Sequence, residues 1–402
     1  MKEVLVLGGG FAGVWAAAGA VRTRKILGAP DDAFRVTLVA PADDMVIRPR
    51  LYESDPARMR VSLDRVLGPI GVRRVAATAL GIDTAAGTVD VVERDGAART
   101  LHYDRLALAT GSRLIRPTLP GAEHLFDVDT LPAAAALHSH LQRLADDPDK
   151  PGAWTAVVVG AGFTGIEVAT ELTGRLAELS AGHPVRVLLV DLAAEVGPEL
   201  GDGPRPEILK ALAETGVEVV LNTTIDRVEP TRTIFSDGTE VDAATVIWTA
   251  GMRANHLTEQ IPAERDRLGR LVVDEFLRVP QVPGVYAAGD TAAAVAEPGH
   301  TVTQSCQHAV PQGKFVGVNV ASDLLGHPLV PFAPDPYVTC LDLGEAGAVL
   351  TLGWDRTVSQ TGDEAKKLKS SINSEWIYPT VDDPDLILLH ADHRTTWPTA
   401  SL

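Results

Sequence analysis

The hydrophobic pattern of the chain contains one repeat. A short apolar run ends in Gly8-Gly-Gly10-Phe-Ala-Gly13, and a later apolar run ends in Gly160-Ala-Gly162-Phe-Thr-Gly165. A stretch of helical character follows each glycine cluster, and a second apolar run comes next, over residues 34–39 and 185–190. Continuous apolar strands on either side of a helix are typical of a buried parallel βαβ unit. The pattern therefore predicts an α/β protein with two Rossmann-like domains.

The repeated G-x-G-x-x-G motif predicts that each unit binds a dinucleotide. The first glycine permits a tight turn, the second lets the backbone approach a pyrophosphate, and the third lets helix and strand pack closely. The pyrophosphate is then favoured by the unpaired N–H groups and the dipole of the helix N-terminus. These positions are Gly8, Gly10 and Gly13, then Gly160, Gly162 and Gly165. The alternative, glycines that serve turns only, is weak when the motif occurs twice between strand and helix.

The residue at the end of the second strand of each unit indicates how the ribose of the dinucleotide would be bound. In the second unit it is Asp191, whose carboxylate would hold the ribose hydroxyls and repel a 2′-phosphate, which favours NADH over NADPH. Its alternative role is that of a solvated acid at a strand end. In the first unit the position is Ala40, so ribose contact must come from Asp43, a water molecule or the backbone.

Composition narrows the classes of function. The formal net charge of −17 argues against nucleic acid as a partner. Cys306 and Cys340 are far apart, which excludes a disulfide framework, a cysteine zinc site and a redox dithiol, and the histidines show no metal spacing. The N-terminus has no signal-peptide pattern, and no apolar run approaches the ~18 residues of a membrane span. We expect a cytoplasmic protein, with peripheral contact at the inner face of the membrane and a homodimer both compatible with the sequence.

Five landmarks in order give the chain a family resemblance. They are Gly8–Gly13, Pro49–Glu53, Ala109–Gly111, Trp248–Gly251 and Gly284–Asp290. Together they resemble the two-dinucleotide-binding flavoproteins, the FAD-dependent pyridine nucleotide oxidoreductases, and within them the type II NADH dehydrogenase-like branch. The resemblance implies FAD on the first unit and NADH on the second. It implies a discontinuous FAD domain of residues 1–117 plus 250–330, an NADH domain of residues 118–249, and an acceptor-side or interface region of residues 331–402.

The resemblance also implies a set of cofactor-binding residues. They are Gly8, Gly10, Phe11, Ala12, Gly13, Arg48, Ala79, Thr110, Gly111, Gly289, Asp290, Ala309, Gly160, Gly162, Phe163, Thr164, Gly165, Asp191 and Gly251. Glu167 falls on the first helical turn after the second motif, and the resemblance places it beside nicotinamide and flavin. A carboxylate buried there would have a raised pKa and could relay a proton. The alternative is an acid that complements the helix dipole.

The acceptor side of the flavin is predicted from two further motifs. The segment from Cys306 to Gly313 resembles the quinone-site pattern A-Q-x-A-x-Q, with Gln307 on the first glutamine and Pro311 on the second. Loss of the second glutamine weakens the quinone assignment. Trp376-Ile-Tyr378-Pro resembles the C-terminal Ile-Tyr-Pro of the family. We expect Gln307 to be catalytic and an acceptor pocket near Gln307, Pro311, Trp376 and Tyr378. The basic run over residues 366–369 is expected to be a solvated helix face or to contact lipid headgroups.

The leading hypothesis is an enzyme that oxidises NADH, with hydride transfer to flavin N5 and electron transfer to a quinone or another flat aromatic acceptor. One rival is a soluble biosynthetic or detoxifying flavoprotein that acts on a small molecule. The other rival is a redox-responsive protein that binds FAD and NADH.

Overall fold

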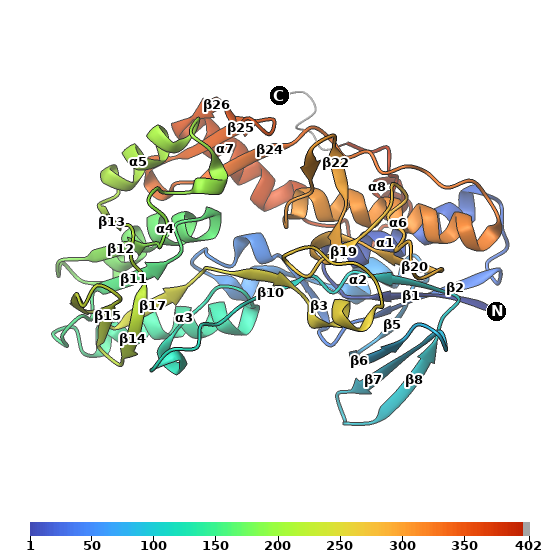
Figure 1. Ribbon diagram of the computed structural model, residues 1–402, viewed down its shortest axis with the longest axis horizontal. Coiled ribbons are helices and arrows are strands. Elements are labelled where there is room, and N and C mark those ends of the chain that lie inside the picture. The colour runs from blue at the N-terminus through green and yellow to red at the C-terminus, as the bar shows by residue number, and fades with distance from the viewer. Residues whose placement is uncertain (397–402) are drawn as a thin grey trace.

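The first apolar run forms the centre of a five-stranded parallel sheet. The computed structural model describes residues 1–396. The sheet has the order β20-β9-β1-β2-β5 (Figure 1). Its strands are β1 (Lys2–Leu7), β2 (Phe34–Val39), β5 (Arg73–Val75), β9 (Arg105–Leu108) and β20 (Val285–Ala287). Since β1 pairs with β2 on one side and β9 on the other, the strand order reverses at β1, where such sheets bind ligands beyond their carboxyl ends.

Two helices cover this sheet at very short distance from each other. They are α1 (Phe11–Ile26) and α6 (Cys306–Leu325). A Cβ on Gly317 would lie 2.5 Å from the Ala16 carbonyl oxygen, and a Cβ on Gly313 would lie 2.3 Å from the Ala12 carbonyl oxygen. Only glycine permits this approach, which brings the N-terminal ends of both helices to one place.

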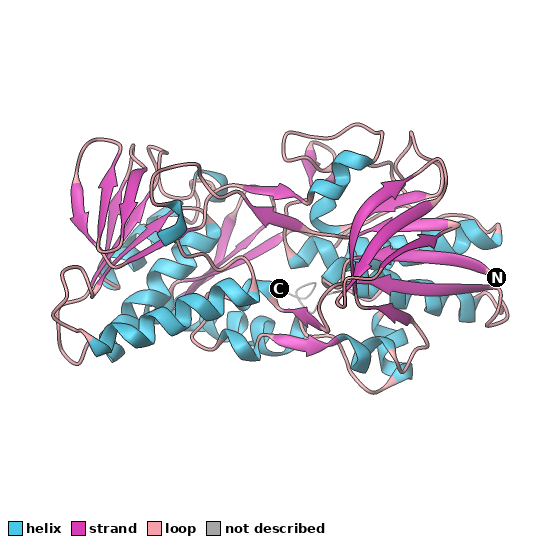
Figure 2. Ribbon diagram, turned by 90° about the horizontal axis from the view of Figure 1, so that it is seen from below, coloured by secondary structure: helices cyan, strands magenta, loops and turns pink. Residues whose placement is uncertain are grey.

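The second apolar run forms the centre of a four-stranded parallel sheet of order β13-β12-β11-β17. Its strands are β11 (Thr155–Val159), β12 (Arg186–Val190), β13 (Val217–Val220) and β17 (Thr245–Trp248). The helices of this unit are α3 (Leu131–Arg143), α4 (Phe163–Leu179) and α5 (Arg205–Glu214). The two predicted βαβ units and the α/β class are thereby confirmed. In Figure 2 the strands gather into two groups along the long axis.

A short helix and several small sheets, antiparallel except for one parallel pair of two-residue strands, complete both units. Within the described residues they are α2 (Leu63–Leu67), β3 (Asp44–Val46) with β4 (Arg60–Ser62), β6 (Ala77–Asp83) with β7 (Thr88–Glu93) and β8 (Ala98–His102), β14 (Ile225–Glu229) with β15 (Arg232–Phe235) and β16 (Glu240–Asp242), β19 (Leu271–Val272) with β21 (Ala292–Ala293), and β22 (Val295–Glu297) with β23 (His300–Thr301). The ribbon of β10 (Ser112–Leu114) and β18 (Met252–Ala254) carries the chain out of the first unit and back.

The C-terminal segment spans both units. Strands β24 (Val338–Asp342), β25 (Ala348–Leu352) and β26 (Thr357–Thr361) form an antiparallel sheet, and α7 (Gly362–Ser371) packs on it. The π-helical turn Ile372–Trp376 follows, and α8 (Pro384–His390) lies against α1. In Figure 1 this segment runs from α4 and α5 across to α1 and α6. The exact domain boundaries stay a prediction.

Candidate functional site

The first glycine loop leaves open space above its second glycine. Gly8 has φ +115°, and a Cβ on it would lie 2.1 Å from the Ala109 carbonyl oxygen, so only glycine fits between β1 and β9. A Cβ on Gly13 would lie 1.9 Å from the Gly8 carbonyl oxygen. Gly10 begins α1 without a side-chain cap, and nothing lies within 4 Å of the position of its Cβ. The N–H groups of this helix end are therefore open to a pyrophosphate.

Three further segments converge on this loop. A Cβ on Gly289 would lie 2.9 Å from Ala12 Cβ and 3.5 Å from Ala309 Cβ, so the turn after β20 and the start of α6 lie against the start of α1. Among the described residues, the buried hydroxyl of Thr110 and the buried Nε2 of Gln312 have no hydrogen-bond partner. Open backbone beside unpaired donors fits FAD. The other predicted residues of this unit are Phe11 at the start of α1, Ala79 in β6, Gly111 after β9 and Gly251 after β17.

Asp290 anchors a polar cluster at the end of β20. Its Oδ2 accepts a hydrogen bond from Ser112 Oγ at 2.6 Å and lies 3.5 Å from Arg48 Nη1. Arg48 also donates to Ser112 Oγ at 2.9 Å and pairs with Asp129. Burial raises the pKa of Asp290, while Ser112 and Arg48 oppose the rise. The structure thus brings together Arg48 and Asp290, which the resemblance implies as cofactor-binding residues.

In the first unit Ala40 stands where the second unit has Asp191, and the carboxylate of nearby Asp43 is already paired with arginines. Ala40 is buried at the end of β2. Asp43 lies 2.7 Å from Arg94 Nη1 and 3.0 Å from Arg74 Nη1. The hydrogen bond from Arg94 holds the pKa of Asp43 below its usual value. A ribose in this unit would therefore meet an ion cluster.

The second glycine loop repeats the geometry of the first and adds an acid. Gly160 has φ +108°, and a Cβ on Gly165 would lie 1.7 Å from the Gly160 carbonyl oxygen. Asp191 Oδ2 accepts a hydrogen bond from the Ala161 N–H at 2.6 Å, and its Oδ1 accepts one from the Ala193 N–H at 2.7 Å. The half-buried Asp191 therefore lies on the glycine loop, where it also fits a ribose. At the start of α4, Gly162 is the N-cap, Phe163 is half-buried and Thr164 is exposed.

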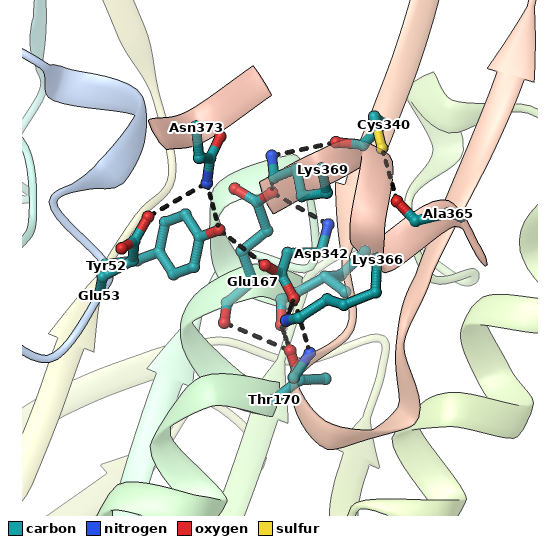
Figure 3. A network of polar contacts seen from close by, with 12 residues as sticks. Tyr52, Glu53, Glu167, Thr170, Cys340, Asp342, Ala365, Lys366, Lys369 and Asn373 are labelled. Carbon is teal, nitrogen blue, oxygen red and sulfur yellow. Dashed lines mark hydrogen bonds and ion pairs between the residues drawn. The ribbon is translucent and has the colours of Figure 1, made fainter. Parts of the chain in front are cut away.

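Glu167 lies at the centre of a buried polar network (Figure 3). It stands in the second turn of α4, one turn further than the sequence indicated, and is 5% exposed. Its Oε1 accepts hydrogen bonds from Lys369 Nζ at 2.8 Å and from the Asp342 N–H at 3.1 Å. Burial raises the pKa of Glu167, and the Lys369 ammonium opposes the rise. The expected burial and the expected direction of its pKa are confirmed, and the ion pair argues against a role limited to the helix dipole.

The lysines of α7 are placed differently from the prediction. The expectation of a solvated or lipid-facing basic run is wrong for Lys369, which is 6% exposed and also donates to the Cys340 carbonyl oxygen at 3.0 Å. Lys366 pairs with Asp342, and only Lys367 is exposed. Lys369 stands four residues after the buried Ala365 and three before Ile372. This apolar spacing was the signal in the sequence that a lysine here faces inward.

The segment after β3 completes the network from the first unit. Tyr52 Oη donates to Asp342 Oδ2 at 3.0 Å, and Asn373 Nδ2 donates to Tyr52 Oη at 3.3 Å and to Glu53 Oε1 at 3.1 Å. Figure 3 shows Tyr52, Asp342 and Lys369 converging on Glu167 from separate parts of the chain. Sequence reasoning missed Asp342, Lys369 and Asn373 because each lies far along the chain from Glu167.

The residues predicted to form the acceptor pocket lie against different parts of the chain. The Gln307 amide lies on the backbone before β24: its Nε2 is 3.3 Å from the Pro336 carbonyl oxygen, and the flipped amide would donate to Val338 O at 2.7 Å and accept from Val338 N at 3.1 Å. Pro311 lines a shallow hollow with Lys314 and other residues of α6 and the C-terminal segment.

On the other side of the predicted pocket, Tyr378 Oη accepts a hydrogen bond from Arg50 Nη1 at 2.9 Å, and Trp376 is half-buried. No described contact joins Gln307, Pro311, Trp376 and Tyr378 to one another, so their common pocket stays a prediction.

The part of the chain that the structure describes also bears on reactive cysteines, metal sites and membrane-spanning helices. Burial raises the pKa of the Cys306 and Cys340 thiols to about 11, and neither cysteine forms a disulfide. Over residues 1–396, no three or more His, Cys, Asp or Glu side chains are grouped to hold a metal ion. Within the same residues, no helix has the length and apolar character needed to cross a bilayer.

Comparison with known proteins agrees with this geometry. The sequence profile described as pyridine nucleotide-disulphide oxidoreductase matches residues 2–313. An NADH dehydrogenase-like protein of Mycobacterium tuberculosis is 47% identical over 395 residues, which cover 97% of this chain and 98% of that protein. The demethylphylloquinone reductase of Synechocystis is 26% identical and covers 87% of this chain and 86% of its own. The structure of NDH2 from Plasmodium falciparum with NADH superposes with a TM-score of 0.77 at 13% identity, over 97% and 96% of the two chains.

Proposed function

The chain belongs to the pyridine nucleotide-disulphide oxidoreductase family, and from that premise we propose that it passes electrons from NADH, through FAD, to a quinone or a similar flat aromatic acceptor. It is an FAD- and NADH-binding oxidoreductase. The observation that carries the proposed mechanism is the buried pair of Glu167, on the helix that begins at the second glycine loop, and Lys369, on α7.

The first unit supplies the residues that would hold FAD. Gly8 to Gly13 and the start of α1 would receive the pyrophosphate, Arg48 and Asp290 would hold the cofactor nearby, and Thr110 and Gln312 offer unpaired groups. When bound, FAD supplies a two-electron relay between NADH and the acceptor.

The second unit would position NADH. The loop from Gly160 to Gly165 would receive its pyrophosphate. Asp191 would accept hydrogen bonds from the hydroxyls of its adenosine ribose, since each carboxylate oxygen retains a lone pair beyond the hydrogen bond that it accepts from a backbone N–H. A 2′-phosphate would be repelled by Asp191. The next residues, Leu192 to Ala194, carry no charge that would compensate. This arrangement favours NADH over NADPH.

Glu167 and Lys369 would hold and move a proton. The ionised Glu167 carboxylate is paired with Lys369 in the protein interior, and when Glu167 takes up a proton the Lys369 ammonium keeps the Cys340 carbonyl oxygen as an acceptor. Burial lowers the pKa of Lys369, but Glu167, Cys340 and Asp342 together raise it to about 12, so the lysine stays charged. Lys369 is therefore a positioning residue that limits the rise in the pKa of Glu167.

The quinone class of acceptor is supported by relatives more than by the pocket. A demethylphylloquinone reductase matches most of the chain, and Gln307 stands where the family pattern has its first glutamine. The second candidate function is a soluble reductase of another small molecule. It is favoured by Gln307, whose amide lies on the backbone at Pro336 and Val338, and by Pro311, which lines a hollow near Lys314.

One assay separates these functions. Purified protein would be mixed with NADH and a panel of quinones of different ring size, with dioxygen alone as the control. We expect NADH oxidation to rise at least tenfold with one class of quinone over dioxygen, on the order of 1.4 kcal/mol in the transition state. Equal rates with every quinone and with dioxygen would contradict the quinone proposal and favour the second candidate. Absence of flavin reduction by NADH would contradict both.

A further inference from the structure

The loop after β12 places a carboxylate on the second glycine motif. A Cβ on Gly162 would lie 2.4 Å from Glu199 Oε1, whereas a Cβ on Gly10 would meet nothing within 4 Å. The backbones of the two glycines are nearly identical, with φ −82° and ψ −169° at Gly162 and φ −88° and ψ −168° at Gly10. Both begin a long helix and neither helix has a side-chain cap. The two loops thus differ in what lies above them and not in their own shape.

The backbone of Glu199 is held from both sides. The 3₁₀ turn η5 (Pro198–Leu200) follows Gly197, whose N–H donates to the Ala161 carbonyl oxygen of the glycine loop at 2.9 Å. Arg356 Nη2, from the turn between β25 and β26, donates to the Glu199 carbonyl oxygen at 3.2 Å. Leu200 is buried, which fixes the turn on the unit.

The side chain of Glu199, by contrast, is free to rotate. Glu199 is exposed, and no cation or hydrogen-bond donor is paired with its carboxylate among the described residues. What favours the carboxylate at this place is the positive end of the α4 dipole and the open N–H groups of the helix. The same field would attract a phosphate.

We propose that the Glu199 carboxylate occupies the position of the NADH pyrophosphate and competes with the nucleotide for the start of α4. The inference rests on the proposed assignment of Gly160 to Gly165 as the NADH loop. Two anions cannot share one helix end, so Glu199 must rotate away when NADH binds. The apparent dissociation constant is then the intrinsic constant divided by the fraction of molecules with the site open. The built-in competitor weakens the binding of the nucleotide and of its oxidised product, which suits a ligand that exchanges at every turnover.

Calorimetric titration with ADP-ribose tests the inference without turnover. ADP-ribose carries the pyrophosphate, and adenosine serves as a ligand that lacks it. We expect Glu199→Ala to lower the dissociation constant for ADP-ribose by about threefold or more and to leave adenosine binding unchanged. Glu199→Gln keeps the shape of the side chain and reports how much of the gain comes from its charge. Glu214→Gln, an exposed acid of the same unit on α5, is the matched control and should change neither constant.

The outcomes are distinct. If Glu199→Ala leaves ADP-ribose affinity unchanged or weakens it, Glu199 is no competitor and the inference is wrong, although NADH still binds the loop. If the wild-type protein fails to bind ADP-ribose, the assignment of the loop fails and the inference fails with it. The flavin absorption spectrum of each variant shows that the fold and the first unit are intact.

Discussion

Trp15 and Glu167 occupy the same position in the two copies of the dinucleotide motif, and each faces a buried lysine. Lys314 Nζ lies 5.4 Å from the centroid of the Trp15 ring, and Lys369 Nζ lies 2.8 Å from Glu167 Oε1. Burial lowers the pKa of Lys314 to about 8. Burial lowers the pKa of Lys369 as well, but Glu167, Cys340 and Asp342 together raise it to about 12. A buried lysine beside an aromatic ring therefore has a lower pKa than a buried lysine beside a carboxylate.

On the proposed function, this difference separates the unit that holds FAD from the unit that supplies a proton-carrying group. In the first unit the helix position behind the glycine loop is filled by the aromatic ring of Trp15, which has no group that titrates. In the second unit the same position carries an acid paired with a cation from α7. Since both loops have the same backbone, the division of labour comes from single side chains placed on a repeated scaffold.

The largest effect is expected from the second glycine of each motif. Gly10→Leu should place its side chain where the pyrophosphate would lie and yield colourless protein, with flavin occupancy below about one tenth. Gly162→Leu should keep the flavin and abolish its reduction by NADH. Absorption spectra and rapid mixing with NADH check both variants. Full flavin occupancy in Gly10→Leu would contradict the assignment of the first loop to FAD.

The next largest effect is expected at Glu167. Glu167→Gln should keep FAD and NADH affinity and slow turnover about 10²-fold, the usual scale for loss of general acid–base catalysis. Rapid mixing shows whether reduction by NADH or reoxidation by the acceptor carries the defect. Unchanged rates in both half-reactions would leave Glu167 as a structural acid.

The ion pair of Glu167 and Lys369 can be tested through the pH dependence of kcat. Lys369→Met removes the cation that opposes the rise in the pKa of Glu167, so that pKa should rise further. A step that needs the ionised carboxylate would then begin at higher pH, and the acidic limb of the kcat profile should move upward. Lys314→Met, at the corresponding place of the first unit, is the control and should leave the profile unmoved. A profile unchanged in Lys369→Met would contradict the role of the pair.

A moderate effect is expected from the acid that only the second unit carries. Asp191→Ala should narrow the preference for NADH over NADPH, since repulsion of a 2′-phosphate amounts to roughly 1–3 kcal/mol, or about 5- to 150-fold. Flavin reduction rates with the two nucleotides measure the ratio. Equal rates already in the wild-type protein would mean that Asp191 is no ribose clamp.

The smallest effect is expected at Gln307. On the quinone hypothesis, Gln307→Ala should slow reoxidation by quinone about tenfold, a loss of about one hydrogen bond, and spare reduction by NADH. Because the Gln307 amide already lies on the backbone near Val338, a variant with both half-reactions intact would place the acceptor elsewhere and favour the second candidate function.

The sequence by itself determined the two glycine loops, the strands before them, Asp191 and the position of Glu167 on a helix. These features are local: a strand, a turn and a helix start depend on residues within a few positions of one another, so their spacing carries the information. The order of landmarks also led to FAD and NADH.

Only the tertiary structure decided what surrounds these features. Lys369 reaches Glu167 across 202 residues of sequence, and Asp342 reaches it across 175. Two further contacts join residues that are distant in the sequence. The Glu199 carboxylate lies next to Gly162, and Arg94 and Arg74 form ion pairs with Asp43. Contacts between such distant residues leave no periodic pattern along the chain. At Glu167 and Lys369 the packing of whole units leaves both charged groups out of water, and each is paired with the partner that lies near it in space.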